Sequence, residues 1–224
     1  MDLKKAREEE RRQDAKRRKQ TMITAATTCF SRHGIENTSI TDIAREAGFG
    51  EATIYRYFST KENLALECGI SFWHQAWDFF QNRTCMEGYA QKNGMQQAEA
   101  LMRGALEFYQ EKQELFRFIY NLDSAMLSNR ASDETKLKYE QSVDSLRPFL
   151  LNALEKGKAD GSLTRPETAL ELYYTLTNGI FSMMQKQSAA PELLETDKLV
   201  DRIRKTELLV ELLISSLSKE LVPK

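Results

Sequence analysis

Four side chains within AGFGEATIYRYF, residues 47–58, carry groups that could contact a nucleic acid. Thr53 offers a hydroxyl group, Arg56 a guanidinium group, and Tyr55 and Tyr57 offer phenols. Inside a groove of duplex DNA, such groups can reach base edges, a thymine methyl group or phosphate oxygens. Two other interpretations compete with this one: a glycine loop that cradles a phosphate group, and a segment of aromatic core.

The elements around this segment argue against the phosphate loop. A short helix is predicted after Ser39, a suitable N-cap residue, with Asp42 three residues later near the capping-box position. Gly48 ends that helix, and a second one begins at about Glu51. Two short helices joined by GFG form the arrangement of a helix-turn-helix, whose second helix enters the major groove. A GxGxxG loop instead follows a strand and needs a third glycine, where this chain has Thr53.

The two faces of the second helix favour the same interpretation. At about 100° per residue, Ile54 and Phe58 share one face and can anchor this helix to the elements before it. The side chains that point away from that face, or flank it, are those of Ala52, Thr53, Tyr55, Arg56 and Tyr57. The two tyrosines suit either groove contacts or half-buried packing, and the pattern leaves both alternatives open.

The longer segment ITDIAREAGFGEATIYRYFSTKENL resembles the DNA-binding signature of the tetracycline-repressor (TetR-type) family of bacterial transcription regulators. The similarity covers about residues 20–66 and is spread over many positions: Ala26, Phe30, Gly34, Ile43, Ala44, Ala47, Gly48, Tyr55, Phe58, Lys61, Glu62 and Leu64. The resemblance implies an all-α homodimer, in which a three-helix DNA-binding head precedes a larger helical body for ligand binding and dimerisation.

Carried over by position, the resemblance makes Thr53 and Tyr55 groove contacts, and Thr41, Tyr57 and Lys61 phosphate contacts. The full predicted DNA-binding set is Ser39, Thr41, Glu51, Ala52, Thr53, Tyr55, Arg56, Tyr57 and Lys61. Three positions depart from the family's pattern. Gly50 replaces the usual Ser or Thr cap, and Tyr57 replaces a common histidine. Glu51 is unusual so close to DNA, and it could accept from cytosine N4 or disfavour wrong operators.

Charge and helix-breaking residues predict the organisation of the chain. The predicted first domain, residues 1–64, consists of a charged extension, 1 to about 18, that could continue the first helix, and of the helix-turn-helix. It holds 13 Lys/Arg against 10 Asp/Glu, whereas the predicted body, residues 65–224, holds 19 against 23. The first 147 residues contain no proline, which favours helices throughout. The expected helices are about 16–33, 40–47 and 51–58, a long one capped by Ser59 with Glu62, then 95–111, 113–127, 134–159, 166–187 with Thr164 as cap, and 196–219.

The body is expected to bind a small apolar or aromatic molecule and to form a homodimer. Residues 70–80 and 108–120 together hold ten aromatic side chains among 24 residues, more than one core needs. The predicted ligand-binding residues are Trp73, His74, Trp77, Phe80, Phe116, Tyr120 and Tyr174, although His74 could equally be a packing residue. The predicted dimer interface on the last two helices comprises Tyr173, Gly179, Ile180, Leu199, Ile203, Val210, Leu213 and Leu217, unless both helices are buried in one monomer.

Other classes of function find little support in the residues. Two histidines, no Ser/His/Asp order and no cluster with metal-ligand spacing argue against an enzyme, and no cofactor or metal is expected. No apolar run is long enough for a membrane span, and the first residues lack a signal peptide, so a cytoplasmic protein without membrane contact is expected. The predicted function is a dimeric, ligand-responsive repressor of a pseudo-palindromic double-stranded DNA operator. The alternative is a helical scaffold protein that binds DNA without sequence preference.

Overall fold

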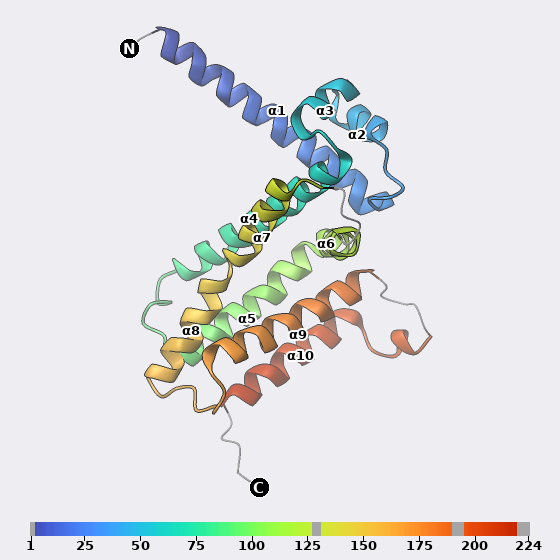
Figure 1. The fold of residues 1–224 in the computed structure, drawn as a ribbon. Coiled ribbons are helices and arrows are strands. Elements are labelled where there is room, and N and C mark those ends of the chain that lie inside the picture. Colours follow the sequence, from blue (N-terminus) through green and yellow to red (C-terminus); the bar gives the residue numbers. More distant parts are fainter. Residues whose placement is uncertain (1–2, 127–130, 190–194, 219–224) are drawn as a thin grey trace. The chain divides into compact units, whose positions relative to one another are not determined.

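The computed structural model describes residues 3–126, 131–189 and 195–218, and the regular structure in these ranges is helical, without a strand (Figure 1). The predicted all-α fold is confirmed. The elements are α1 (Leu3–His33), α2 (Ile40–Ala47), α3 (Glu51–Phe58), α4 (Lys61–Thr84), α5 (Gly94–Glu111), α6 (Gln113–Met126), α7 (Asp133–Asp144), α8 (Arg147–Ala159), α9 (Ala169–Ala189), the 3-10 helix η1 (Glu195–Leu199) and α10 (Arg202–Ser218). None of the helices in the described ranges is long and apolar enough to cross a membrane.

The chain forms two compact units. Unit 1 comprises Met1–Phe72 and Asn121–Glu140, and unit 2 comprises Trp73–Tyr120 and Gln141–Lys224. Helices α4, α6 and α7 each contribute residues to both units. The predicted boundary after Leu64 concerns which segment carries DNA binding, and it stays a prediction.

In unit 1, α1 packs on α2, and α2 on α3. The largest buried side chains at their centre are Met22, Phe30, Ile43, Ile54, Leu64 and Leu66. The later segment of this unit packs on α4 at Gly69, where an added Cβ would lie 2.6 Å from both Leu122 and Tyr139. The Tyr139 hydroxyl group donates to Asp123 Oδ1 over 3.0 Å. The segment 121–140 is therefore an integral part of this unit.

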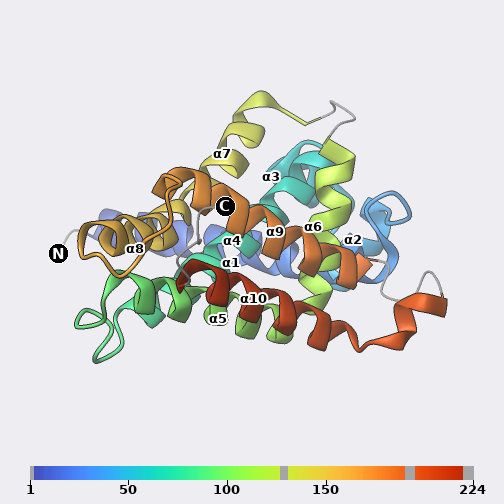
Figure 2. The same ribbon diagram turned by 90° about the horizontal axis from the view of Figure 1, so that it is seen from below.

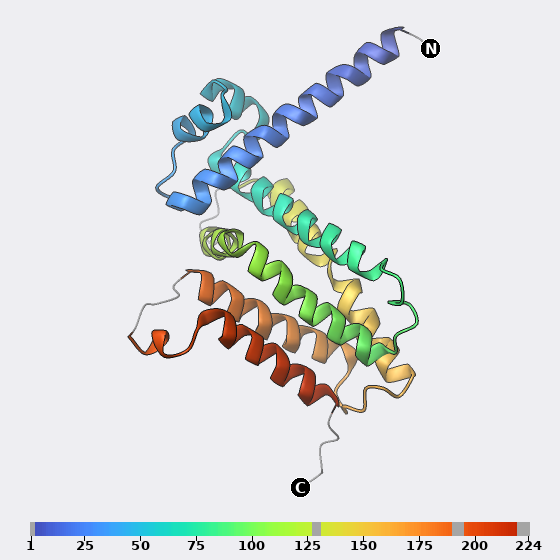
Figure 3. The ribbon, with the colours of Figure 1, turned by 180° about the vertical axis from the view of Figure 1, so that it is seen from behind.

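Helix α1 begins at Leu3, so the charged extension before the helix predicted at about 16–33 continues that helix. Its N-terminal half consists mainly of glutamate, arginine, lysine and glutamine, which lose little rotamer freedom in a helix. The costly nucleation step is already met by the packed half of the helix, from Met22 to Phe30, so the charged residues only extend it. The result is one continuous helix whose first half has no element of unit 1 against it (Figures 1 and 3).

Three other predicted helix boundaries are wrong. The last helix begins at Arg202 rather than 196, after the 3-10 helix η1. The single helix predicted for 134–159 is divided into α7 and α8, because Pro148 lies in the first turn of α8 and lacks the N–H that a continuous helix would need. Helix α9 begins at Ala169 rather than 166. Thr168, not Thr164, caps it: its Oγ1 accepts from the Glu171 N–H over 3.2 Å, and Glu171 Oε2 accepts from the Thr168 N–H over 2.8 Å.

In unit 2, α5, α8, α9 and α10 form a closed set in which α5 packs on α8 and α10, and α9 packs on the same two helices (Figures 1 and 2). The contact between α5 and α8 is made through glycines. A Cβ on Gly94 would lie 1.9 Å from the backbone nitrogen of Gly157. The α8 end also caps α5, since the N–H of Gly94 donates to Asp160 Oδ2 over 2.8 Å and that of Met95 donates to Ser162 Oγ over 3.0 Å.

Candidate nucleic-acid interface

Helix α2 begins and ends as its sequence predicts. The Ser39 Oγ accepts from the Asp42 N–H over 3.1 Å, and Asp42 Oδ2 accepts from the Ser39 N–H over 3.2 Å, which completes a capping box. Gly48 closes the helix with φ at 71°, in the left-handed region. Because its hydroxyl group also donates to Asp42 over 2.5 Å, Ser39 already has a structural role, and a DNA contact from it stays a prediction.

Helix α3 has the two faces that its sequence predicts. Ile54 and Phe58 are buried, with 1% and 4% of their surface exposed. Ala52 and Arg56 are exposed, Tyr55 is 48% exposed, and Thr53 and Tyr57 are half-buried. The Tyr57 ring lies between Phe58, at 6.1 Å between ring centroids, and the Arg56 guanidinium group, 5.8 Å from its centroid. The two tyrosines therefore differ: Tyr55 is available to contact a groove, whereas Tyr57 is partly engaged in packing.

The two unusual residues at the start of α3 have distinct structural consequences. Gly50 is in the N-cap position and makes no side-chain cap, as predicted. Glu51 Oε1 accepts from the Thr41 hydroxyl group over 2.8 Å, so it links α3 to α2. Both Thr41 and Glu51 are exposed. In this arrangement the Thr41 proton is directed at Glu51, and a phosphate would have to compete with that carboxylate for it.

A very tight connection joins α3 to α4. Ser59 has φ at 64° and ψ at −44°, and the Thr60 N–H donates to the Phe58 carbonyl over 2.7 Å, which defines a γ-turn. Thr60 Oγ1 accepts from the Asn63 N–H over 3.0 Å and so caps α4. The predicted capping box of Ser59 with Glu62 is therefore wrong, because Ser59 ends α3 instead of starting α4.

Lys61, predicted as a phosphate contact, is engaged within unit 1. Its Nζ donates to the carbonyls of Ile35 at 2.8 Å, Thr38 at 3.1 Å and Glu36 at 3.4 Å. These carbonyls belong to the loop between α1 and α2, which begins at Gly34 with φ at 80°. The ammonium group has only three protons to donate, so its first role is to hold this loop against the start of α4.

An amphipathic helix with an exposed polar and aromatic face, preceded by a capped helix and a glycine turn, is the geometry of a helix-turn-helix. The family profile described as "Bacterial regulatory proteins, tetR family" matches residues 22–68, which contain α2, α3 and the packed half of α1. The match covers the head, so the chain carries a TetR-family DNA-binding domain. It is a DNA-binding transcriptional regulator, and the resemblance predicted from residues 20–66 is confirmed.

Curated relatives of this TetR-family regulator extend the similarity beyond the head. An HTH-type transcriptional regulator from Staphylococcus aureus strain MRSA252 is 26% identical over 180 residues, which cover 72% of this chain and 91% of the relative. The protein of the same description from strain USA300 is 28% identical over 147 residues, covering 58% and 76%. Both are described as transcriptional regulators.

Solved structures show the same fold over most of the TetR-family chain. The regulator FadR from Bacillus subtilis, in complex with stearoyl-CoA, has a TM-score of 0.65 at 15% identity and covers 88% of this chain and 97% of its own. A TetR-family regulator from Agrobacterium tumefaciens has a TM-score of 0.68 at 16% identity, covering 91% and 99%. The ketosteroid regulator KstR2 from Mycobacterium tuberculosis has a TM-score of 0.64 at 15% identity, covering 91% and 96%.

The predicted ligand-binding residues of the regulator fall into two groups. Trp73 and Phe116 are buried, Phe80 is half-buried, and Trp77 is 38% exposed. These four lie in a continuous series of ring contacts, each with centroids 5.1 to 6.1 Å apart, that also includes Phe79, Phe108, Tyr109, Phe149 and Phe181. The remaining three, His74, Tyr120 and Tyr174, are exposed.

The sequence did not identify Phe149 and Phe181 as partners of these rings. Phe181 lies 5.3 Å from Trp73 and 5.5 Å from Phe116, and Phe149 lies 6.1 Å from Trp77. They belong to α8 and α9, far along the chain from α4. A helical aromatic residue in each of those two helices was the available signal, but only tertiary packing shows which rings meet.

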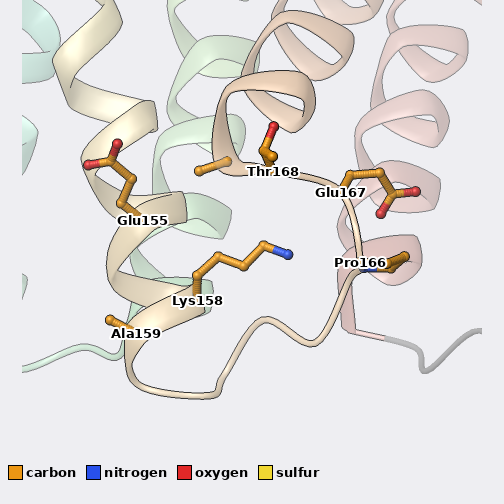
Figure 4. A pocket seen from close by; sticks show the side chains of 7 residues that line it. Glu155, Lys158, Ala159, Pro166, Glu167 and Thr168 are labelled. Carbon is orange, nitrogen blue, oxygen red and sulfur yellow. The ribbon is translucent and has the colours of Figure 1, made fainter.

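An open pocket of about 500 Å³ lies elsewhere in unit 2, between the end of α8 and the start of α9 (Figure 4). Its lining residues are Glu155, Lys158, Ala159, Pro166, Glu167, Thr168 and Ala169, none of which was predicted. Figure 4 shows the Lys158 side chain extending from α8 toward the segment of Pro166 and Glu167. Its amine donates to the Arg165 carbonyl, and Arg165 holds Glu167 at 2.6 Å. Lys158 and Glu167, two of the lining residues, thus already have polar partners beside the pocket.

Three of the predicted dimer-interface residues are not available to a partner. Ile180, Val210 and Leu217 are buried in unit 2, with 5%, 1% and 2% of their surface exposed, because α9 and α10 turn these side chains toward each other and toward neighbouring helices. Tyr173, Ile203 and Leu213 are half-buried, and Gly179 and Leu199 are exposed.

Most of the large apolar side chains that α9 and α10 leave exposed were not among the predicted interface residues. Leu170 and Tyr174 are separated by one helical turn on α9, and Leu208 and Leu212 by one turn on α10; their exposed fractions range from 43% to 59%. Gly179 lies on the exposed side of α9, where an added Cβ would meet nothing within 4 Å. A spacing of four residues was the signal that could have selected these pairs.

Proposed function

We propose that this TetR-family regulator is a ligand-responsive repressor that binds a pseudo-palindromic operator as a homodimer. The observation that carries the proposal is the exposed face of α3. Tyr55 and Arg56 are exposed beside the half-buried Thr53, on a helix that Ile54 and Phe58 fix to unit 1. A phenol, a guanidinium group and a hydroxyl group on one rigid helix suit the edges of bases in the major groove.

The roles on α3 differ among the three side chains. Arg56 pairs with guanine or with a phosphate, Tyr55 contacts a thymine methyl group, and Thr53 reaches a base edge at closer range. Glu51 acts through its link to Thr41. If the carboxylate keeps this bond in the complex, it stays out of the groove; if DNA breaks the bond, Glu51 becomes free to accept from cytosine N4.

The test is selection of preferred sequences from a pool of random duplexes, followed by binding measurements with variants. Tyr55→Ala and Arg56→Ala should each reduce affinity for the selected sequence by about 1–3 kcal/mol and relax the preference at one position. Arg32→Ala is the matched control, since Arg32 is an exposed arginine at the far end of α1 in the same unit. Selection that yields no preferred sequence would favour the scaffold alternative, in which DNA binding is only electrostatic.

The effector proposed for the regulator is a small apolar molecule that inserts among the rings around Phe116 and Phe181. Support comes from the series of ring contacts that joins α4, α5, α6, α8 and α9, because an apolar molecule entering there would displace side chains from five helices. The fold neighbours include a structure that contains stearoyl-CoA and a ketosteroid regulator. A ligand that binds one arrangement of these helices better than another shifts the population of DNA-binding states.

Effector binding can be tested without knowing the operator. Quenching of the two tryptophans, Trp73 and Trp77, is measured while stearoyl-CoA, free fatty acids or a sterol are added. Phe181→Ala should weaken saturable quenching at least tenfold, because its ring contacts both Trp73 and Phe116. Tyr89→Ala is the control, because Tyr89 lies in the connection between α4 and α5 and has no proposed role in ligand binding or dimerisation. Quenching that does not saturate with any of these compounds, or that Phe181→Ala leaves unchanged, argues against this effector site.

The dimer is proposed to form through Leu170 and Tyr174 of α9 and Leu208 and Leu212 of α10. Each of these two helices exposes one apolar turn, and the helices pack together, which suits a two-fold interface. Leu212→Glu should convert the protein to a monomer in analytical ultracentrifugation, whereas Arg103→Glu on α5 should not. A wild-type protein that sediments as a monomer at all concentrations would contradict the dimer.

A further inference from the structure

The exposed first half of α1 is a basic arm that the helix-turn-helix does not account for. We define this arm as residues 5–19, the part of α1 that precedes its packed half and whose side chains are exposed or half-exposed. Residues 11–19 hold six lysines and arginines and one acidic residue, Asp14, while the three glutamates of the arm lie together at positions 8–10. The excess positive charge of residues 1–64 is therefore concentrated in the part of the arm next to the packed head.

Part of this basic charge is already compensated within the protein. Arg17 pairs with Asp14 at 3.0 Å, and Lys19 pairs with Glu67 at 2.8 Å. Among the described residues, Arg11, Arg12, Lys16 and Arg18 take part in no ion pair, and all four are exposed. Four uncompensated cations on one exposed helix keep a strong positive potential, which suits a polyanion better than a neutral partner.

The packed half of α1 shows which way these cations face. Arg12, Lys16 and Lys19 follow one another at steps of four and three, so they form one line along the helix. Lys19 is the end of that line, and its Nζ lies 5.9 Å from the centroid of Phe58 at the end of α3. The line of Arg12 and Lys16 is thus on the side of α1 that carries α3.

Arg11 and Arg18 form a second line, seven residues apart, on another side of the helix. Cys29 lies eleven residues, or three turns, beyond Arg18 and shares its side. Cys29 faces α2: burial first, and then the charges of Glu46 and Asp42, raise the pKa of its thiol. The second pair of cations is therefore on the α2 side, away from the proposed groove-reading helix.

We propose that the arm is a second DNA-contacting element, in which Arg12 and Lys16 bind phosphates beside the site that α3 occupies. The proposal goes beyond the helix-turn-helix and rests on the regulator binding DNA. At 1.5 Å per residue, the arm reaches about 22 Å, or roughly six to seven base pairs along a duplex. Because it continues an anchored helix, its cations are held in place before binding, and little ordering entropy opposes the contact. Phosphate contacts of this kind add affinity and set register without reading sequence.

The experiment is the salt dependence of binding to a fluorescein-labelled duplex of arbitrary sequence, about 30 base pairs long. Each lost phosphate contact reduces the slope of log K against log salt concentration by about 0.9, so Arg12→Gln with Lys16→Gln should flatten it by about 1.8 per bound protomer. Between about 50 and 200 mM salt, this corresponds to a roughly tenfold smaller loss of affinity per protomer. Glutamine keeps the helix propensity, and circular dichroism confirms that the arm stays helical.

Arg11→Gln with Arg18→Gln is the matched control, with the same change of charge on the same helix but on the α2 side. The proposal holds if only the Arg12 and Lys16 variant flattens the slope. It is overturned if that variant keeps the wild-type slope, or if both variants flatten it equally, since general charge would then be responsible. If the wild-type protein shows no salt-dependent binding to the duplex, both the proposal for the arm and the proposed DNA-binding function are wrong. If only the proposal for the arm is wrong, Tyr55→Ala still reduces affinity for the selected operator.

Discussion

The glycine contact between α5 and α8 makes Gly94→Ala the sharpest prediction for the body of the regulator. A Cβ at this position would lie 1.9 Å from the backbone nitrogen and 2.2 Å from the Cα of Gly157. Backbone atoms cannot rotate away as a side chain can. The two helices would have to separate by about 1.5 Å to bring the closest pair to an ordinary contact distance.

Separation of α5 and α8 has two costs. Overpacking a buried contact costs about 1–3 kcal/mol, and breaking the bond from the Gly94 N–H to the Asp160 carboxylate adds about 1–2 kcal/mol. The free energy of unfolding should therefore fall by about 2–5 kcal/mol, which corresponds to a transition roughly 10 °C lower for a protein of this size. Gly157→Ala gives a graded comparison, because its nearest neighbour would be Leu163 Cβ at 3.0 Å, and it should cost about 1–2 kcal/mol.

The measurement is urea denaturation followed by circular dichroism at constant protein concentration, because a dimer's stability depends on concentration. The order of the two variants is as informative as their magnitude. A Gly94→Ala protein within about 1 kcal/mol of wild type would refute the argument, since helices that close cannot absorb a methyl group at so little cost. A Gly157→Ala protein that is the less stable of the two would refute it as well.

Three further predictions concern the head. Ser59→Gly should stabilise the protein by about 1 kcal/mol in the same denaturation assay, because glycine adopts a positive φ without strain. Lys61→Met should destabilise the loop between α1 and α2 by about 1–3 kcal/mol, seen as faster amide exchange in that loop, because three carbonyls lose a charged donor. The Ser39 hydroxyl and N–H, followed by Arg45, hold the pKa of Asp42 below its ordinary value. That contribution to stability is present above about pH 4 and is lost as pH falls through the lower folded-state pKa, so Asp42→Asn should flatten the acid limb of stability measured against pH.

The features of the head that could be predicted depend on residues close together in the chain. The capping box of Ser39 and Asp42, the left-handed Gly48 and the inward face of Ile54 and Phe58 each involve a few positions along one helix. Helical periodicity and cap chemistry determine them before any tertiary contact forms.

What could not be predicted depends on distant or competing partners. The link from Thr41 to Glu51 and the bonds from Lys61 to the α1–α2 loop arise only when separate helices come together. Ser59 and Thr60 both have cap chemistry, and the γ-turn, which decides between them, leaves no mark in the residue types. On α9, periodicity shows that two sides are apolar but does not show which side faces the protomer's own core; packing selects Ile180.

Because of the γ-turn at Ser59, only two residues connect α3 to α4. Phe58 ends one helix and Lys61 begins the next, and the two intervening residues are fully committed to closing α3 and capping α4. Such a short connection is expected to be stiff, so a displacement of the first turn of α4 would also displace α3. For protein engineering, the exposed side chains of α3 can be varied to test the proposed operator preference, while Gly50 and Ser59 remain as fixed end points. An added residue in that connection would instead uncouple α3 from α4.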